Sequence, residues 1–313
     1  MSVSPTDAYA IGIVGAFLTG AVLDLAGRRD GARVVTVGAW VAFAGFWAVL
    51  TPGFLFEELS YVKGLLSAAG VPASVYVGYV LYRGRDSLLT LSRGVAVMGL
   101  VYLPFNVFEP LMRPLIWTVV VQVEFAMDAL GYAPTLERGH EIGNQIGLAN
   151  AFTFVIGDHA YRTEVVLACT GIGSISIFAG LVAAVDAPYS RRFKALAIAV
   201  PVIYGLNVIR VTFIALAHGN QWFRGDAIEG AVMTLFGTSN VHRVSYLVAD
   251  RIIAQSLSVV ALVIIALLLV RALPELFEIF EDVLFVVTGD EYDLAGAFGA
   301  DGSTDETVAA GDD

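Results

Sequence analysis

The chain has 313 residues, of which 57% are hydrophobic and only 15% charged, and its mean hydropathy is +0.75. Soluble domains carry about 25% charged residues, so this composition excludes an ordinary soluble protein and indicates a polytopic membrane protein. The net charge of −11 argues against nucleic-acid binding, which requires basic patches.

Long apolar stretches predict an all-α membrane protein with seven spanning helices. A run of about 18 apolar residues is enough to cross a hydrocarbon core of ~30 Å. In chain order the predicted spans are residues 8–27, 34–54, 66–83, 87–107, 164–187, 195–217 and 246–270. Residues 1–273 are therefore expected to form one integral membrane domain that carries the catalytic site.

Three short connections predict the orientation of the chain. The segments "RRDGAR" (28–33), "RGRD" (83–86) and "YSRRFK" (189–194) hold eight basic residues in sixteen positions. Basic residues concentrate in cytoplasmic loops, and all three segments fall on one side of a seven-span arrangement. The N-terminus is therefore expected outside the cell and the C-terminus inside.

Two outer segments have their own patterns. Residues 115–132 are apolar but contain Glu124 and Asp128, which favours an interfacial or re-entrant helix over a span. Residues 150–166 carry β-branched and aromatic residues on both sides of a Gly-Asp turn, which predicts a small extracellular hairpin.

The C-terminal segment 274–313 is expected to be an acidic, partly disordered cytoplasmic tail. It contains twelve Asp or Glu residues and no Lys or Arg. This composition is typical of a solvated segment, either as an ordinary acidic tail or through the acidic surface bias of a salt-adapted organism.

Cys169, Arg210 and Arg251 are expected to lie at similar depths near the outer membrane face. The only cysteine, Cys169, lies 18 residues from Ala187, or about 27 Å above the inner end of its span. Arg210 lies 16 residues beyond Lys194, or about 24 Å up the next span. Asn207 shares its helical face and is expected to bond Arg210 or a substrate.

The last span offers three basic residues near its outer end. Arg251 lies 20 residues before Arg271, or about 30 Å up, whereas Arg243 lies about 42 Å up, beside His242. Depth therefore favours Arg251 as the partner of Cys169 and Arg210. We expect Thr170, His242 and Arg243, with Asn207, to contact the substrate.

Structural roles are the alternatives for these residues. A lone cysteine is often a buried packing residue, Arg210 can serve an internal ion pair, and an Arg such as Arg251 near the end of a span often extends to the interface. The four histidines, His140, His159, His218 and His242, fall in or beside outer loops, as surface residues do. The acids within the predicted spans, Asp24, Glu164, Asp186 and Asp250, lie near span ends and are expected to be solvated.

A thiol and two guanidiniums at one depth favour acyl transfer through a thioester. A nearby cation stabilises the reactive thiolate, and a guanidinium stabilises the oxyanion of a tetrahedral intermediate. Arginine stays protonated and cannot act as an ordinary general base. The nucleophile is expected to face the outer side and to need no metal or cofactor.

The stretch "LACTGIGS", then "NVIR" about forty positions later, then "VSYLVADRIIAQS", resembles the exosortase/archaeosortase superfamily, and within it the archaeosortases. The resemblance implies a Cys–Arg–(His or Arg) active site. Cys169 matches the nucleophile and Arg210 the first basic residue. The third position maps to Arg251, with the His242–Arg243 pair as the alternative.

The resemblance also implies a substrate and a reaction. The substrates would be secreted surface proteins, the S-layer glycoprotein among them. Their C-terminal signal combines a Pro-Gly-Phe motif, a transmembrane helix and a basic tail. The enzyme would cleave near the motif and join the new C-terminus to a membrane phospholipid.

The competing function is a transporter that binds an anion or small solute at Arg210. Transporters of this kind show internal repeats with broken helices in matching halves, and the sequence contains no such repeat. A retinal protein is excluded because Lys63 and Lys194, the only lysines, lie outside the predicted spans.

Overall fold

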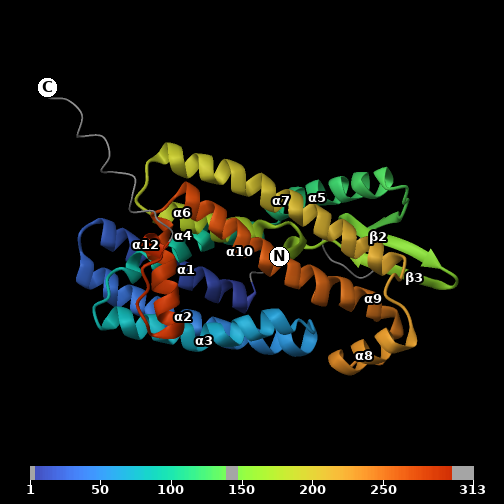
Figure 1. Ribbon diagram of the computed structural model, residues 1–313, viewed down its shortest axis with the longest axis horizontal. Coiled ribbons are helices and arrows are strands. Elements are labelled where there is room, and N and C mark those ends of the chain that lie inside the picture. The colour runs from blue at the N-terminus through green and yellow to red at the C-terminus, as the bar shows by residue number, and fades with distance from the viewer. Residues whose placement is uncertain (1–3, 139–146, 298–313) are drawn as a thin grey trace.

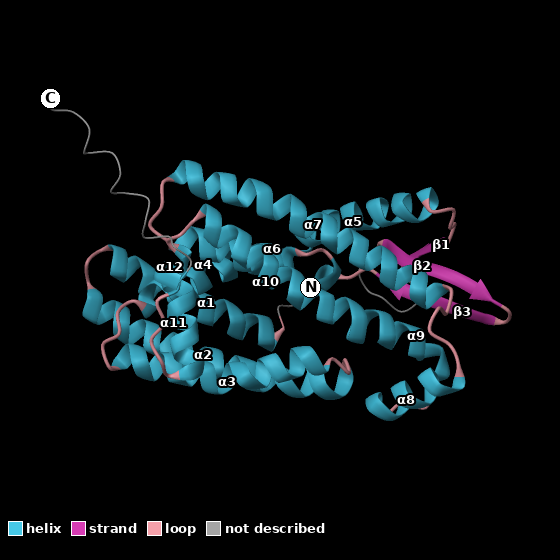
Figure 2. Cartoon of the chain, in the orientation of Figure 1, coloured by secondary structure: helices cyan, strands magenta, loops and turns pink. Residues whose placement is uncertain are grey.

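The computed structural model describes residues 4–138 and 147–297. Within them the chain forms a helical bundle with a small antiparallel sheet at one end (Figures 1 and 2). The strands are β1 (Thr135–Arg138), β2 (Ala149–Ile156) and β3 (His159–Glu164). The helices are α1 (Pro5–Leu25), α2 (Arg29–Pro52), α3 (Tyr61–Tyr82), α4 (Leu88–Val107), α5 (Glu109–Ala129), α6 (Ile172–Ala184), α7 (Tyr189–Gly219), α8 (Asp226–Phe236), α9 (Val244–Tyr246), α10 (Gln255–Ala272), α11 (Leu276–Thr288) and α12 (Leu294–Ala297).

The predicted all-α polytopic architecture is confirmed. Among the described residues, six helical segments are long and apolar enough to cross a membrane. Two of them extend beyond one α-helix: α2 continues through a π-helical turn to Glu57, and the last segment runs from Val241 to Ala272 through a second π-helical stretch. The six segments are Pro5–Leu25, Arg29–Glu57, Tyr61–Tyr82, Leu88–Val107, Tyr189–Gly219 and Val241–Ala272.

The predicted count of seven spans is not confirmed, because the expected span 164–187 contains only the 13-residue helix α6. That helix is about 20 Å long, shorter than the ~30 Å hydrocarbon core. The residues before it form the end of β3 and a 3₁₀ turn, Leu167–Cys169. Val165 is fully buried, in one core cluster with residues of α5 and α7, so its apolar character serves packing within the protein.

The predicted outer hairpin is present as β2 and β3, which pair in register from Ala151 with Glu164 to Ile156 with His159. The sequence did not indicate β1, which pairs with the other edge of β2. Helix α5 lies where the interfacial helix was expected but begins at Glu109. It buries Val119, Val120 and Val123 beneath the sheet and against α7.

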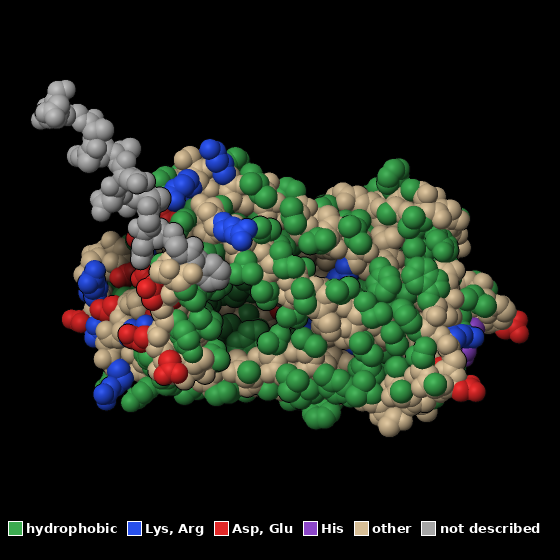
Figure 3. Space-filling model, in the orientation of Figure 1, with side chains coloured by type: hydrophobic (Ala, Val, Ile, Leu, Met, Phe, Trp, Pro, Cys, Tyr) green, Lys and Arg blue, Asp and Glu red, His purple; other side chains and the backbone are tan. Residues whose placement is uncertain are grey.

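The first part of the acidic tail is not a solvated chain. Helix α11 buries Leu276, Ile279 and Asp282 against the bundle. Asp282 accepts hydrogen bonds from Arg85 Nε and Ser87 Oγ, each at 3.0 Å. The tail acids therefore neutralise the basic loops, and Figure 3 shows charged side chains of both signs gathered at this end. The expected disorder of residues 298–313 concerns a segment outside the described residues.

Helices α4 and α6 approach each other closely at Gly180, which yields a stability prediction. A Cβ at this position would lie 2.4 Å from the carbonyl oxygen of Gly94, so Gly180→Ala forces two backbones apart. We expect a loss of roughly 1–3 kcal/mol in unfolding free energy, visible as a lower Tm in detergent. Gly38→Ala, where a Cβ meets nothing within 4 Å, is the matched control and should leave the Tm equal or higher. Equal Tm values for both variants would contradict the close packing.

Candidate active site

Cys169 lies at the end of a 3₁₀ turn that connects the sheet to α6. Its amide donates to Val166 O at 2.8 Å, and the Thr170 amide donates to Leu167 O at 3.0 Å. The Thr170 hydroxyl also donates to Leu167 O, at 2.7 Å, and Thr170 is fully buried. Thr170 therefore shapes the turn that carries the half-buried Cys169 thiol. Its predicted contact with a substrate stays a prediction.

Helix α7 fixes this turn through Asn207. The Asn207 side-chain amide donates a hydrogen bond to the Cys169 carbonyl oxygen. Gly171 follows with a φ of +78°, a left-handed conformation that favours glycine, and a Cβ there would lie 3.3 Å from Asn207 Cβ. Asn207 is thus bonded to the backbone of Cys169 rather than to Arg210.

Arg210 and Arg251, selected above by depth, meet at one carboxylate. Arg210 Nη2 lies 2.8 Å from Asp250 Oδ1, and Arg251 Nη1 lies 3.1 Å from Asp250 Oδ2. Asp250 is only 6% exposed, so its expected solvation was wrong. A carboxylate can be buried here because two guanidiniums compensate its charge.

The local helix geometry explains how an acid near the end of a span becomes buried. Residues Leu247–Ala254 are π-helical, which changes the direction of the side chains relative to a regular α-helix. Tyr246 precedes this stretch, and its hydroxyl donates to Asp250 Oδ2 at 3.1 Å. The Tyr246 ring also lies 5.8 Å from the Arg251 guanidinium, within cation–π range.

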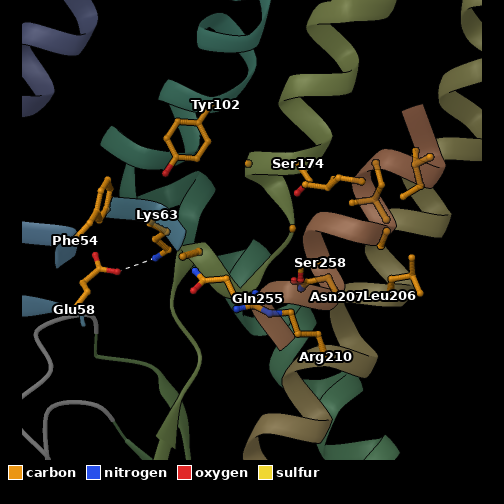
Figure 4. A pocket seen from close by; sticks show the side chains of 17 residues that line it. Phe54, Glu58, Lys63, Tyr102, Ser174, Leu206, Asn207, Arg210, Gln255 and Ser258 are labelled. Carbon is orange, nitrogen blue, oxygen red and sulfur yellow. Dashed lines mark hydrogen bonds and ion pairs between the residues drawn. The ribbon is translucent and has the colours of Figure 1, made fainter. Parts of the chain in front are cut away.

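A cavity of about 500 Å³ opens beside the Cys169 turn (Figure 4). Ala168 and Gly171 line it on either side of Cys169 in the sequence, and Arg210 forms part of its wall. Its other lining residues are Phe54, Glu58, Lys63, Tyr102, Gly173, Ser174, Ile203, Leu206, Asn207, Gln255, Ser258, Ala261, Leu262 and Ile265.

The cavity brings a third cation to the site. Lys63, in the first turn of α3, pairs with Glu58 at 2.8 Å, and both line the cavity (Figure 4). Burial raises the pKa of the Cys169 thiol, while the charges of Arg210 and Lys63 act to lower it and that of Asp250 acts to raise it. Sequence reasoning missed Lys63 and Glu58 because they lie far from Cys169 in the chain. Asp250 directly precedes Arg251 in the sequence, and this adjacency was the available signal that the acid belongs to the site.

The His242–Arg243 pair lies beside β3. His242 Nδ1 lies 2.9 Å from the Tyr161 hydroxyl, and its ring stacks on His159 with centroids 3.9 Å apart. Arg243 is exposed. The ion pairs of Asp250 thus favour Arg251 as the third residue, and a substrate contact by the pair stays a prediction.

Of the other two described histidines, His159 is exposed, as expected, and His218 is half-buried. His159 stacks on His242, and His218 Nδ1 lies 3.0 Å from the Thr163 hydroxyl. His140 lies outside the described residues. No cluster of three or more His, Cys, Asp or Glu residues that could hold a metal ion occurs within residues 4–138 and 147–297.

The arrangement is suited to acyl transfer. A free thiol stands in a turn fixed by α7, and guanidinium groups lie nearby. Among the described residues, Nε of both Arg210 and Arg251 is buried without a hydrogen-bond partner. The Arg210 guanidinium is partly exposed and lines the cavity, so its remaining N–H donors are able to bind a carbonyl oxygen on which negative charge develops.

Comparison with known proteins identifies the family. The model of the transmembrane exosortase family matches residues 3–241. The chain belongs to this family. It is 48% identical to Archaeosortase A of Haloferax volcanii over 306 residues, covering 95% of this chain and 98% of the relative. It is 44% identical to Archaeosortase A of Natronomonas pharaonis over 282 residues, covering 90% and 89% of the two chains. No solved structure matches it.

The matches with known proteins cover different parts of the candidate site of this exosortase-family protein. The family match includes Cys169 and Arg210 but ends before Asp250 and Arg251. The match with the Haloferax volcanii relative covers 95% of the chain. The assignment of Arg251 therefore depends on the Asp250 ion pairs rather than on the family match.

Proposed function

We propose that this protein is a membrane-embedded cysteine transpeptidase that cleaves the C-terminal sorting signal of secreted surface proteins. The observation that carries the proposal is the placement of the only thiol, Cys169, beside a cavity whose wall contains Arg210. The two relatives named Archaeosortase A support it, because each covers at least 90% of this chain.

The reaction proceeds in two acyl transfers. The Cys169 thiolate attacks the carbonyl carbon of the scissile peptide bond, and a guanidinium of Arg210 or Arg251 stabilises the oxyanion. The C–N bond then breaks, its electron pair stays on nitrogen, and the departing amine takes up a proton. The resulting thioester is attacked by an acceptor, which loses a proton as the sulfur leaves.

The proposed substrates and acceptor follow from the family resemblance. The substrates are surface proteins, such as an S-layer glycoprotein, whose signal combines a Pro-Gly-Phe motif, a transmembrane helix and a basic tail. The acceptor is a membrane phospholipid. The cavity supports an amphiphilic partner, because it is polar around Arg210 and Gln255 and apolar deeper in the bundle, around Ile203, Leu262 and Ile265.

We place the site on the extracytoplasmic side. Cys169 follows β3 by five residues, so it lies toward the sheet end of the bundle. The basic α1–α2 and α3–α4 connections lie at the opposite end (Figure 1). Since basic loops favour the cytoplasm, the thiol faces outward.

The test is to trap the thioester. A signal-bearing peptide is incubated with the purified protein, the reaction is quenched in acid, and intact mass is measured. We expect a mass increase equal to the acyl fragment, located on Cys169 and released by hydroxylamine. A cleaved substrate with no acyl adduct at any quench time would contradict the covalent mechanism.

A further inference from the structure

Among the residues that the structure describes, Asp250 is the only acid that bridges two arginines. Each guanidinium is held by a different oxygen, Arg210 by Oδ1 at 2.8 Å and Arg251 by Oδ2 at 3.1 Å. The Tyr246 hydroxyl donates to Oδ2 at 3.1 Å and thereby fixes the carboxylate itself. These contacts determine the separation and the direction of the two cations.

We infer that Asp250 is a positioning residue, which together with Tyr246 aims the Arg210 guanidinium at the reacting carbonyl. The inference rests on the proposed function. The Arg210 head group has five N–H donors and gives one of them to Asp250, so the others stay available toward the cavity that it lines. Without a fixed acceptor, a long arginine side chain samples many rotamers. Most of these do not direct the guanidinium at the oxyanion, so its average stabilisation of the oxyanion is weaker.

Asp250 favours catalysis by positioning Arg210, but its negative charge disfavours the thiolate form of Cys169. Asp250 and Arg210 both interact electrostatically with Cys169, the acid opposing the thiolate and the cation stabilising it. Neutralising Asp250 therefore makes the surroundings of the thiol more positive, while it loosens the guanidinium. The two effects have opposite signs on two measurable quantities, thiol reactivity and substrate processing.

The experiment compares wild type with Asp250→Asn at matched membrane expression. The first readout is the rate of Cys169 alkylation by iodoacetamide, which is unambiguous because the chain has no other cysteine. The second is cleavage of a signal-bearing reporter. We expect alkylation to become several-fold faster and processing to become at least ten-fold slower. Loss of folding would also expose the thiol and speed its alkylation, so the Tm of the variant is measured beside both readouts and should stay within a few degrees of wild type.

The control is Asp282→Asn. Asp282 is also buried, 3% exposed, and paired with an arginine, but it lies at the cytoplasmic end. This variant should leave both readouts within about two-fold of wild type. If Asp250→Asn does not accumulate, Tyr246→Phe replaces it. Since Tyr246→Phe removes one hydrogen bond and no charge, processing should fall several-fold with alkylation unchanged.

Three outcomes would overturn the inference: wild-type processing by Asp250→Asn, alkylation of that variant that is unchanged or slower, or wild-type processing by Tyr246→Phe. Failure of the proposed function is a separate result. In that case the wild-type protein itself does not cleave the reporter, whereas the alkylation comparison still reports whether Asp250 controls the thiol.

Discussion

Replacing Cys169 by alanine is expected to abolish processing of a signal-bearing substrate, with a loss of at least about 10³-fold, since removal of an enzyme's nucleophile leaves only binding and oxyanion stabilisation. Cys169→Ser should be nearly as inactive, because a hydroxyl is far less acidic than a thiol. Neither change should unfold the protein. The turn is held by backbone bonds of Cys169, its amide to Val166 O and its carbonyl to Asn207, which both variants retain.

Reporter cleavage in membranes and the Tm of the purified variants together check this expectation. Both variants should show wild-type Tm within a few degrees. Normal cleavage by Cys169→Ala would disprove the nucleophile assignment. The thiol would then be a packing residue, and another group would have to act as the nucleophile.

The second large effect is expected for Arg210→Lys, although the substitution keeps the charge. A guanidinium offers a planar fork of donors, so that it binds Asp250 and a developing oxyanion together. An ammonium is a point charge on a stem of different reach, so one of the two contacts is lost. Loss of one oxyanion donor costs about 10²–10³-fold in rate, and we expect a fall of that order.

Two companion variants show which basic residue completes the site. Arg251→Ala should be comparably damaging, because it removes the second cation from Asp250 and leaves that buried carboxylate half-paired. Arg243→Ala should be milder, since Arg243 is exposed. The three variants are compared on one substrate at equal membrane expression. An inactive Arg243→Ala beside an active Arg251→Ala would move the third position to the His242–Arg243 pair.

Depth along apolar helices was sufficient to bring Arg210 and Arg251 together from the sequence. The role of Asp250 was not predictable in the same way. An acid near the end of a span is usually solvated, and only the π-helical stretch and the two ion pairs reveal its burial. Lys63 was missed for a different reason, because its position at the cavity depends on how α3 packs beside the Cys169 turn.

The difference in span count has a comparable cause. Hydropathy measures whether a residue avoids water, and it does not report whether lipid or protein provides the apolar surroundings. Val165 and Leu167 are apolar, yet they are buried within the protein, in the region that packs against the sheet and α5. The hairpin was predictable because β-branched and aromatic residues on both sides of a Gly-Asp turn are a local signal.

The π-helical stretch before α10 also bears on how such a site changes in evolution. Its hydrogen bonds run from residue i to i+5, so each turn holds one residue more than an α-turn. Deleting one residue between 252 and 254 would favour a regular helix and rotate Asp250 and Arg251 by about 100° relative to α10. The lipid-facing surface of α10 would stay in register. A single-codon deletion or insertion is therefore a more direct route than substitution for relocating the basic residue, and sequence alignments of relatives need a gap permitted at this place.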